Sequence, residues 1–345
     1  MQQNEILTPL SVLDSSGKPQ NLGWSRQPVF FYDPALVWAP RRRITESDRY
    51  ILYSPTHLVI LEIRDDGWLG NMCISVISLR DKKRSTQTIR TLFPMGTFEM
   101  PTSSVNGSIR YKNKKSSLDF ISQNEGIKLI KADFINFGRH RSLRGEVVLS
   151  EPSAAESIVT NQKWLNEKSA FRYNRCSPWY IVEGVIQFGG AEIIFTRGNG
   201  WGIFDWTRGA RPRSDVRYWA AACGTGGAGG EKQISFSVGH SWADSSAGTE
   251  NGFFVDGKLH KLDKITFHIP PSNWLSPWHF TSNDNRLIME FYPHQERIER
   301  RRLFFHNTTR RQVIGFFSGR VILDDGTGVV FQNVTGFAER ARTRF

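Results

Sequence analysis

Apolar and polar residues alternate with a period of two over much of this chain. Residues 233–242 (QISFSVGHSW) place isoleucine, phenylalanine and valine at every second position, with glutamine and serines between them. Residues 264–269 (KITFHI) follow the same rule, and residues 57–63 (HLVILEI) are apolar at nearly every position. Side chains of a β-strand point alternately to its two faces. The first two patterns therefore predict strands with one buried face, and the third predicts a strand covered on both faces.

Turn-forming dipeptides separate these runs. Aspartate or asparagine followed by glycine is typical of type I′ hairpin turns, because both central residues need a positive φ. Helical patterns do not alternate with the strands, so the sequence predicts an antiparallel all-β chain. The dipeptides that predict hairpins are Asp66-Gly67, Asn106-Gly107, Asp256-Gly257 and Asp325-Gly326.

Residues 153–165 (SAAESIVTNQKWL) depart from the alternation. Ser153, followed by Glu156 three residues later, matches a capping box, which would start a short helix. Thr160 and Asn161 are poor helix formers, so the segment could equally be irregular chain that leads into a strand. Both alternatives stay open.

The length of 345 residues is comfortable for two domains of ordinary size. GWSRQP at residues 23–28 is echoed by DWTRGA at residues 205–210, and the tripeptide SPW occurs twice. An eight-stranded antiparallel barrel with its turns takes about 120 to 180 residues. We therefore expect two similar barrels or sandwiches in tandem, at residues 1–190 and 191–345.

Composition indicates a folded protein rather than a disordered one, with 39% apolar and 23% charged residues. The N-terminus has no basic segment followed by an apolar core, so no secretory signal is expected. No run approaches the ~18 to 20 apolar residues of a membrane helix. The three cysteines lie far apart, which argues against a disulfide framework. These features predict a cytoplasmic protein.

A net charge of +12 raises the question of an anionic partner. One function class is a basic surface that binds anionic lipid or nucleic acid. The basic clusters stand mostly beside turn signals and no nucleic-acid-binding motif accompanies them, so solvated loops and strand faces explain them more simply. The clusters are residues 41–43, 82–84, 112–115 and 300–302.

A distinctive series of motifs fills the second half. It contains FDWTRG at residues 204–209, TENGFFVDGKLHKL at residues 249–262 and PWHFTSNDNRLIMEFYP at residues 277–293, and GWSRQP stands near the N-terminus. In this order and wording, from about Leu10 to the C-terminus, the chain resembles the bacterial family catalogued as domain of unknown function 2804.

The resemblance implies a fold more firmly than a function. The family is similar to tandem lipocalin-like proteins, a group with carotenoid hydratases, tocopherol cyclases and some cyclising enzymes. Those relatives bind apolar ligands, and the enzymes among them use buried acids and aromatic residues. Arg311 stands where the resemblance leads us to expect histidine, which puts in doubt any role of that position in relatives. The glycine tract at residues 224–230 is longer than the short loop expected.

FDWTRG places an acid and a base, Asp205 and Arg208, in a segment that ought to be buried. On one extended strand, residues three apart face opposite sides, although Gly209 makes a bend possible. One interpretation is a buried ion pair or a clamp that ties the strand to a neighbour, with the guanidinium packed on Trp206 or Trp219. The less favoured one is that Asp205 faces a ligand as a catalytic acid.

TEN is the second candidate for chemistry. Glu250 precedes a strongly apolar run, and a carboxyl group inside an apolar barrel would have its pKa raised by desolvation. A neutral glutamic acid can donate a proton to an alkene, epoxide or carbonyl, and Asn251 could orient it or bind an oxygen. The alternative is that Glu250 pairs with a basic residue such as Arg208 and that Asn251-Gly252 is a turn. We favour this alternative slightly.

Aromatic residues are abundant, with 11 Trp, 24 Phe and 8 Tyr. Most must fill the cores, but a few could line a pocket for an apolar ligand. The candidate ligand-binding residues are Trp206, Arg208, Trp219, Asn251 and Trp278.

Several chemistries are not expected. The histidines are scattered, without metal-ligand spacing, and no serine lies in G-x-S-x-G. The tract at residues 224–230 lacks the P-loop lysine and is interpreted as a flexible hairpin loop. No metal or cofactor is therefore predicted.

Three functions follow for this architecture, and the fold does not decide among them. The first is binding of a hydrophobic small molecule in a β-barrel pocket. The second is a cofactor-independent hydratase, isomerase or cyclase that acts on a lipophilic, terpenoid-like substrate by acid catalysis. The third is the basic surface described above. The sequence leaves open whether the protein is an enzyme, and its oligomeric state.

Overall fold

Strand pairing divides the chain into two large antiparallel sheets in the computed structural model, which describes residues 3–94, 96–124, 126–138, 141–227, 232–303 and 306–344. The predicted all-β, lipocalin-like class is confirmed, and the described residues contain no α-helix. They therefore include no helix that could cross a membrane. Short elements near the N-terminus are the parallel pair β1 (Leu10–Ser11) and β3 (Phe30–Phe31) and the 3-10 turns η1 (Pro34–Leu36) and η2 (Arg41–Arg43).

Thirteen of the described strands form the first sheet: β2 (Gly23–Ser25), β4 (Ile44–Tyr53), β5 (His57–Asp65), β6 (Leu69–Ser78), β7 (Arg84–Leu92), β8 (Ile109–Lys112), β9 (Ser116–Asn124), β10 (Ile127–Phe137), β11 (Arg141–Ser150), β12 (Ile158–Trp164), β13 (Glu167–Phe188), β14 (Ala191–Phe195) and β15 (Trp201–Ala210). The main path runs β7-β6-β5-β4-β15-β13-β11-β10-β9-β8. β12 pairs with β13 and β2, and β14 pairs with β13.

Nine of the described strands form the second sheet: β16 (Ser214–Gly226), β17 (Lys232–His240), β18 (Gly252–Val255), β19 (Lys258–Lys261), β20 (Ile265–His268), β21 (Trp278–Ser282), β22 (Leu287–Leu303), β23 (His306–Ile322) and β24 (Gly328–Arg344). Their order is β19-β18-β17-β16-β24-β23-β22-β21-β20. β19 and β20, the two ends of this path, do not pair with each other in the described chain, so the sheet curls without closing into a full ring.

Each sheet curls around its own apolar core as a half-barrel. Phe204 and Trp206 of β15 belong to the first core, and Phe236 of β17 and Phe317 of β23 belong to the second. The predicted period of two produces this arrangement, because every second residue of a strand points to the inside of the curl.

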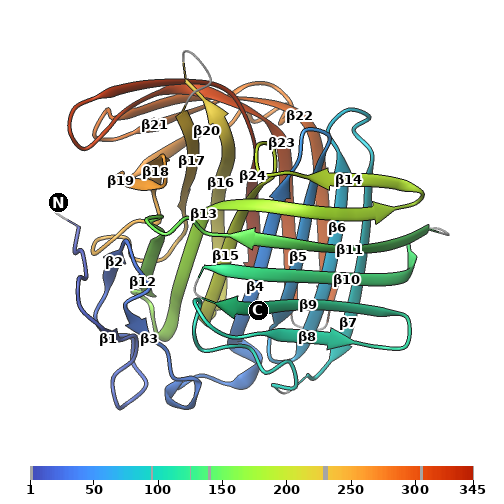
Figure 1. Cartoon of the computed structure of the whole chain (residues 1–345). Coiled ribbons are helices and arrows are strands. Elements are labelled where there is room, and N and C mark those ends of the chain that lie inside the picture. The colour runs from blue at the N-terminus through green and yellow to red at the C-terminus, as the bar shows by residue number, and fades with distance from the viewer. Residues whose placement is uncertain are drawn as a thin grey trace.

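A third apolar cluster joins the two sheets. Ile51 of β4, Ile203 of β15, Trp219 of β16 and Phe337 of β24 meet in it, and strands β4 to β6 lie against strands β22 to β24 (Figure 1). β4 is buried at all ten positions because one face packs into the first core and the other against the second sheet. HLVILEI of β5, predicted to be covered on both faces, is placed in the same way.

The turn predictions are confirmed in part. Asp66-Gly67, Asp256-Gly257 and Asp325-Gly326 each connect adjacent antiparallel strands. Asp256-Gly257 has a positive φ at both positions, 49° and 81°, as a type I′ turn requires, whereas Asp66 and Asp325 lack a positive φ, so the type I′ prediction is wrong for those two turns. The prediction for Asn106-Gly107 is wrong, since this dipeptide lies in the long connection between β7 and β8. β16 and β17 form the hairpin expected around the glycine tract, whose residues 228–230 lie outside the described residues.

Of the two alternatives for residues 153–165, irregular chain that leads into a strand is confirmed. The helix does not form, and β12 begins at Ile158. Two tandem halves are present, and the chain leaves the first sheet at Ala210 and enters the second at Ser214. β14 and β15 thus belong to the first sheet although they follow residue 190, and the predicted domain boundary there stays a prediction.

We expect Phe337→Ala to lower the free energy of unfolding by about 3 to 5 kcal/mol, because its ring is fully buried between the sheets and packs edge-on against Trp219. Val330→Ala on the same strand is the matched control, since Val330 is 53% exposed. Urea unfolding of both variants measures the difference. Equal losses for the two would contradict the importance of the apolar contact between the sheets.

Candidate functional site

The contact between the two sheets is apolar at one end and charged at the other. On β4, Ile51 packs against the second sheet, whereas Arg49, the next residue on the same face, lines a cleft. On β24, Phe337 belongs to the apolar cluster and Glu339 lines the cleft. Neighbours on one strand face are two positions apart, so a single step along each strand changes the shared surface from apolar to charged.

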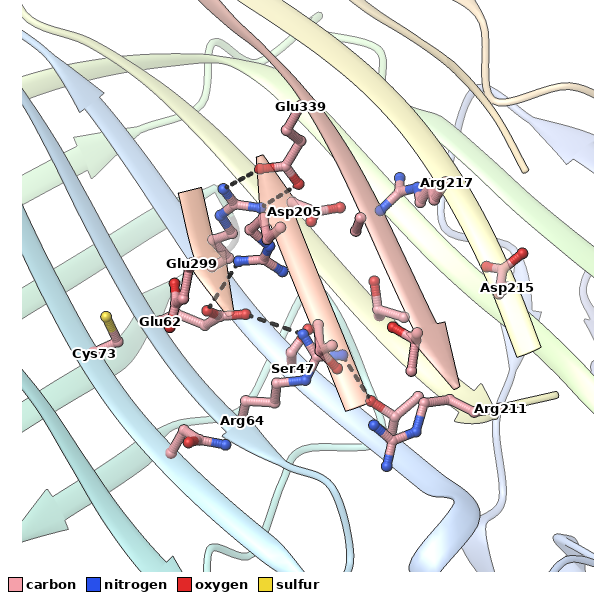
Figure 2. Close-up of a pocket in the computed structure, with 18 of the residues that line it drawn as sticks. Ser47, Glu62, Arg64, Cys73, Asp205, Arg211, Asp215, Arg217, Glu299 and Glu339 are labelled. Carbon is pink, nitrogen blue, oxygen red and sulfur yellow. Dashed lines mark hydrogen bonds and ion pairs between the residues drawn. The ribbon is translucent and has the colours of Figure 1, made fainter. Parts of the chain in front are cut away.

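This space, which we call the arginine cleft, has a volume of about 210 Å³ and lies between β4 to β7 and β15 of the first sheet and β16 and β22 to β24 of the second (Figure 2). Within the described chain, ten arginines and five carboxylates line it, although the guanidinium of one of them, Arg208, is turned to the other face of β15, onto Trp206. Guanidinium groups only donate hydrogen bonds, so the lining is rich in donors and positive charge. The arginines are Arg49, Arg64, Arg84, Arg172, Arg208, Arg211, Arg217, Arg297, Arg301 and Arg310, and the acids are Glu62, Asp205, Asp215, Glu299 and Glu339.

Arg49 and Glu339 form a buried ion pair across the sheets. Both guanidinium Nη atoms donate to the carboxylate, at 3.3 and 3.2 Å, and the guanidinium also lies 5.2 Å from the ring centroid of Trp219. Burial by itself would raise the pKa of Glu339, but the charges of Arg49 and Arg310 outweigh it and lower the pKa to about 2. Glu339 is therefore an ionised carboxylate at neutral pH.

Asp66, in the predicted Asp-Gly turn, forms ion pairs with three of the arginines that line the cleft. Its carboxylate accepts from Arg64 at 2.8 Å and pairs with Arg211 at 3.2 Å and Arg301 at 3.6 Å. Burial opposes ionisation, yet the three guanidinium groups hold the pKa of Asp66 far below its ordinary value. The turn that the sequence predicts from its Asp-Gly dipeptide thus also supplies a carboxylate that holds three arginine side chains in place.

A second hollow, which we call the aromatic cup, lies at the end of the core of the second half-barrel. Its volume is about 910 Å³. On β17, Val238 belongs to the core, and His240, the next residue on the same face, lines the cup. On β16, Ala220 belongs to the core, and Tyr218, its neighbour on the same face, lines the cup. The cup is lined by Gln162, Tyr218, Gly239, His240, Ser241, Ala243, Ser245, Thr249, Glu250, Asn251, Lys264, Ile265, Thr266, Phe267, Ile269, Pro271, Trp274, Arg311 and Arg340.

Rings dominate one wall of the cup. Tyr218 stacks on His240 with centroids 4.7 Å apart, and Phe267 lies within 6 Å of both rings. Burial lowers the pKa of His240, although the charge of Glu250 opposes this, so the imidazole is neutral at neutral pH. Trp274 packs against Arg311 and Arg340, cross-strand neighbours whose guanidinium carbons lie 4.1 and 5.3 Å from its centroid.

Glu250 stands at the border between the cup and the cleft. It lines the cup, while its carboxylate accepts hydrogen bonds from Arg172 at 3.0 Å and from Arg217, both of which line the cleft. The carboxylate lies against Gly239, where a Cβ would come within 2.6 Å of the Tyr218 carbonyl oxygen and 3.1 Å of Glu250 Oε1, so the position needs glycine. Glu250 therefore forms part of the wall that separates the two hollows.

The rise in the pKa of Glu250 that the sequence suggests is wrong. Burial does favour the neutral acid, but Arg172 and Arg217 outweigh it and lower the pKa from an ordinary value of 4.5 to about 2. The alternative, pairing with basic residues, describes the contacts, although the partners are these two arginines and not Arg208. The assignment of Glu250 as a catalytic residue stays a prediction.

Asp205 and Arg208 point to opposite faces of β15, and they form no ion pair in the described structure. Arg208 donates to Asp48 on β4 at 2.8 Å and to the carbonyl oxygen of Pro101, and its guanidinium lies 4.3 Å from the centroid of Trp206. These contacts match the clamp interpretation. Asp205 lines the arginine cleft and accepts from Asn174 Nδ2 at 2.8 Å.

The other predicted site residues do not meet in one place. Trp206, Trp219 and Trp278 belong to three different apolar clusters and line neither hollow. Asn251 lines the cup beside Glu250, but its side chain is engaged: Oδ1 accepts from the Gly239 N–H at 2.6 Å and Nδ2 donates to the Asp263 carbonyl at 2.7 Å. Their ligand-binding roles stay predictions.

Sequence reasoning missed most arginines of the cleft. The basic cluster at residues 300–302 was interpreted as solvated, and Arg300 and Arg302 are indeed exposed. Arg301 between them turns to the cleft and donates to Asn71 Oδ1 at 3.1 Å. Alternation places Arg297, Glu299 and Arg301 on one face of β22, but the register shift between Pro293 and Gln295 turns this face away from the apolar core and toward the cleft, which the sequence pattern alone does not reveal. No group of three His, Cys, Asp or Glu that could hold a metal ion occurs in the described part of the chain.

Comparison with known proteins agrees with this fold. The family model described as "Domain of unknown function (DUF2804)" matches residues 3–345. No curated protein matches the sequence significantly. Among solved structures, an AttH-like protein from Nitrosomonas europaea is 11% identical, with a TM-score of 0.52 over 91% of this chain and 98% of that one.

Two further structures are similar. The protein CghA, solved with Sch210972, is 8% identical, with a TM-score of 0.51 over 88% of this chain and 89% of that chain. Kievitone hydratase from Nectria haematococca is 12% identical, with a TM-score of 0.43 over 87% and 88% of the two chains. At these identities the likeness concerns the fold alone.

We expect Glu250→Gln to lower the free energy of unfolding by about 3 kcal/mol at pH 7, because two buried guanidinium groups lose their carboxylate. The folded-state pKa of Glu250 is lowered, so the contribution is complete above pH 4.5 and disappears as the pH falls to about 2. Urea unfolding at pH 7 and pH 2 measures it.

Glu183→Gln is the control, since Glu183 is exposed on the first sheet. It should change the free energy of unfolding by less than about 0.5 kcal/mol at either pH. A loss for Glu250→Gln that is equally large at pH 7 and pH 2 would show that the ion pairs are not its cause.

Proposed function

The chain belongs to this family, DUF2804, and on that premise we propose that it binds a hydrophobic small molecule with an aromatic or otherwise flat portion in the aromatic cup. The observation that carries the proposal is the position of the cup, which continues an apolar core to the open end of a half-barrel. Apolar side chains such as Ile265, Phe267 and Trp274 line the cup together with polar ones, and small-molecule sites combine these two kinds of group.

The size and lining of the cup support a guest of moderate size. Its volume of about 910 Å³ lies in the ~300–1,000 Å³ range of pockets for small organic ligands. Ile265 and Ile269 offer aliphatic contacts, and Phe267 and Tyr218 offer ring faces and edges. A flat apolar guest would gain both burial and ring stacking there.

Trp274 is the best anchor for such a guest. Arg311 and Arg340 fix its ring from the side of the sheet, and Arg311 is itself paired with Glu296. A tryptophan held in this way loses little freedom when a ligand packs on it, so more of the contact energy appears as affinity. Arg311, where the family resemblance leads us to expect histidine, is thus part of the cup wall.

Acid catalysis has less support than binding. A hydratase, isomerase or cyclase that works by protonation needs a neutral acid beside the guest, and Glu250 is held as a carboxylate by Arg172 and Arg217. Asp205, the other candidate acid, lines the arginine cleft and not the cup. Binding without turnover is therefore the function that the geometry supports best.

A basic surface for lipid or nucleic acid also has less support. Arg41 pairs with Asp65 and Arg43 pairs with Glu167, so this cluster is largely neutralised within the chain. Lys82 and Lys83 are exposed beside a turn. Scattered exposed cations of this kind keep a protein dispersed without forming a site.

We expect Trp274→Ala to weaken binding of the neutral fluorescent probe N-phenyl-1-naphthylamine at least tenfold, because an aromatic side chain that lines the cup is lost. Trp242→Ala is the matched control, since Trp242 is 59% exposed and lies outside the cup. Titration of the probe's fluorescence gives both dissociation constants.

A second variant, Phe267→Ala, keeps the test valid if Trp274→Ala does not fold. Phe267→Ala should also weaken binding of the probe, and circular dichroism should show that both variants keep their β-sheets. Wild-type affinity in Trp274→Ala and Phe267→Ala, or an equal loss in Trp242→Ala, would rule out the cup as the binding site.

A further inference from the structure

Two guanidinium groups reach into the arginine cleft from opposite sheets and share the same hydroxyls. Arg84 begins β7 in the first sheet, and Arg297 lies on β22 in the second. Arg84 donates to Ser75 Oγ and Thr86 Oγ1, both at 3.3 Å, and Arg297 donates to the same atoms at 3.5 and 3.2 Å. The two cations are therefore close neighbours.

The charge of this pair is poorly compensated. Arg84 has no carboxylate within 4 Å among the described residues, and its remaining contact is a neutral one, to Gln312 Oε1 at 3.1 Å. Within the described part of the chain, Arg297 pairs only with the half-exposed Glu299, at 3.5 Å. Burial first, and then the charge of Arg297, lower the pKa of Arg84 to about 9. Holding two such cations together costs free energy unless an anion joins them.

Unused donors line the same space. Asn71 is 6% exposed, and its Nδ2 has no hydrogen-bond partner among the described residues although Oδ1 accepts from Arg301. Arg49 is 3% exposed, and its Nε is likewise unsatisfied there although both Nη atoms bind Glu339. Buried donors nearly always have acceptors in folded proteins, so these groups point to an acceptor that is not part of the chain.

From these contacts we infer that the arginine cleft is a binding site for a small oxyanion, a carboxylate or a phosphate group, seated between Arg84 and Arg297. Guanidinium groups bind both groups through paired N–H donors, and since Ser75 Oγ and Thr86 Oγ1 bond to each other at 2.8 Å, one of these two hydroxyls can add a donor of its own. The volume of about 210 Å³ is smaller than the ~300 Å³ at which pockets for drug-sized ligands begin, so the enclosed part of the ligand is small.

The oxyanion site is independent of the aromatic cup. The cleft lies on the outer face of the second sheet, where Arg217 of β16 and Glu339 of β24 point, whereas Tyr218 and Arg340, one residue further, point into the cup. Strand parity thus places the two sites on opposite faces of the same sheet. A failure of the cup to bind an apolar probe would leave the oxyanion site untouched, and the reverse also holds.

The test measures thermal unfolding of the full chain in sodium chloride, acetate and phosphate at matched ionic strength and pH. A ligand that binds only the folded state raises Tm, so acetate or phosphate should raise the Tm of the wild type by a few degrees over chloride. A larger rise with phosphate assigns phosphate esters as the ligand class, and a larger rise with acetate assigns carboxylates. Equal Tm values in all three salts overturn the proposal.

Arg84→Gln and Arg297→Gln are the informative variants, and Arg300→Gln, on β22 but exposed, is the matched control. In calorimetric titrations, each informative variant should bind the preferred anion at least ~10-fold more weakly than the wild type, whereas Arg300→Gln should bind this anion as tightly as the wild type. Removing one of two crowded cations should also leave the Tm in chloride unchanged or higher. A lower Tm in chloride with an intact anion response would assign Arg84 and Arg297 a structural role and overturn the proposal.

Discussion

Burial of both faces of the central strands is the constraint on which the rest of the molecule depends. β4 and β15 cover the first core with one face and meet the second sheet with the other, and β16 and β24 do the same from their side. Every residue of these strands is committed to one of two environments by its parity. A register slip by one position would therefore exchange Trp206 for Asp205 and destroy two cores at once.

The same constraint explains how far the sequence could be interpreted. Period two was sufficient to predict an all-β chain, because alternation follows from local geometry, but it left open whether a bend at Gly209 would bring Asp205 and Arg208 together. The partner of Arg208 is Asp48, on a strand far away in sequence, and only the pairing of β15 with β4 brings them together. The cleft was missed for this reason, since its charges come from strands throughout both halves. The helix at residues 153–165 failed because a local capping signal was overridden by pairing with β13.

Many of the buried charged residues of this protein form ordered ion pairs, whereas most exposed cations of the described chain do not. Exposed cations such as Arg300 surround the molecule, but the buried arginines are distributed over a few carboxylates, of which Asp66, Glu250 and Glu339 each serve at least two. Because several arginines share each of these carboxylates, the interior has more guanidinium hydrogen-bond donors than carboxylate acceptors. The apolar half of the contact between the sheets supplies the stability that allows this surplus to persist, because each sheet is already fastened to the other through Trp219 and Phe337.

The gap between β19 and β20 gives the second half-barrel a compliant side. A closed barrel can widen only by breaking the ladder of backbone hydrogen bonds around its circumference. Here the circumference is interrupted, and β20 carries Ile265 and Phe267 beside the gap. Outward bending of this flank would break no strand pairing between β19 and β20, although the N–H of Leu262, in the short connection between them, donates to the Asn251 carbonyl at 3.1 Å and limits the movement. Such bending would let the proposed binding cup accept ligands of different size while the other strand pairings of the sheet stay intact.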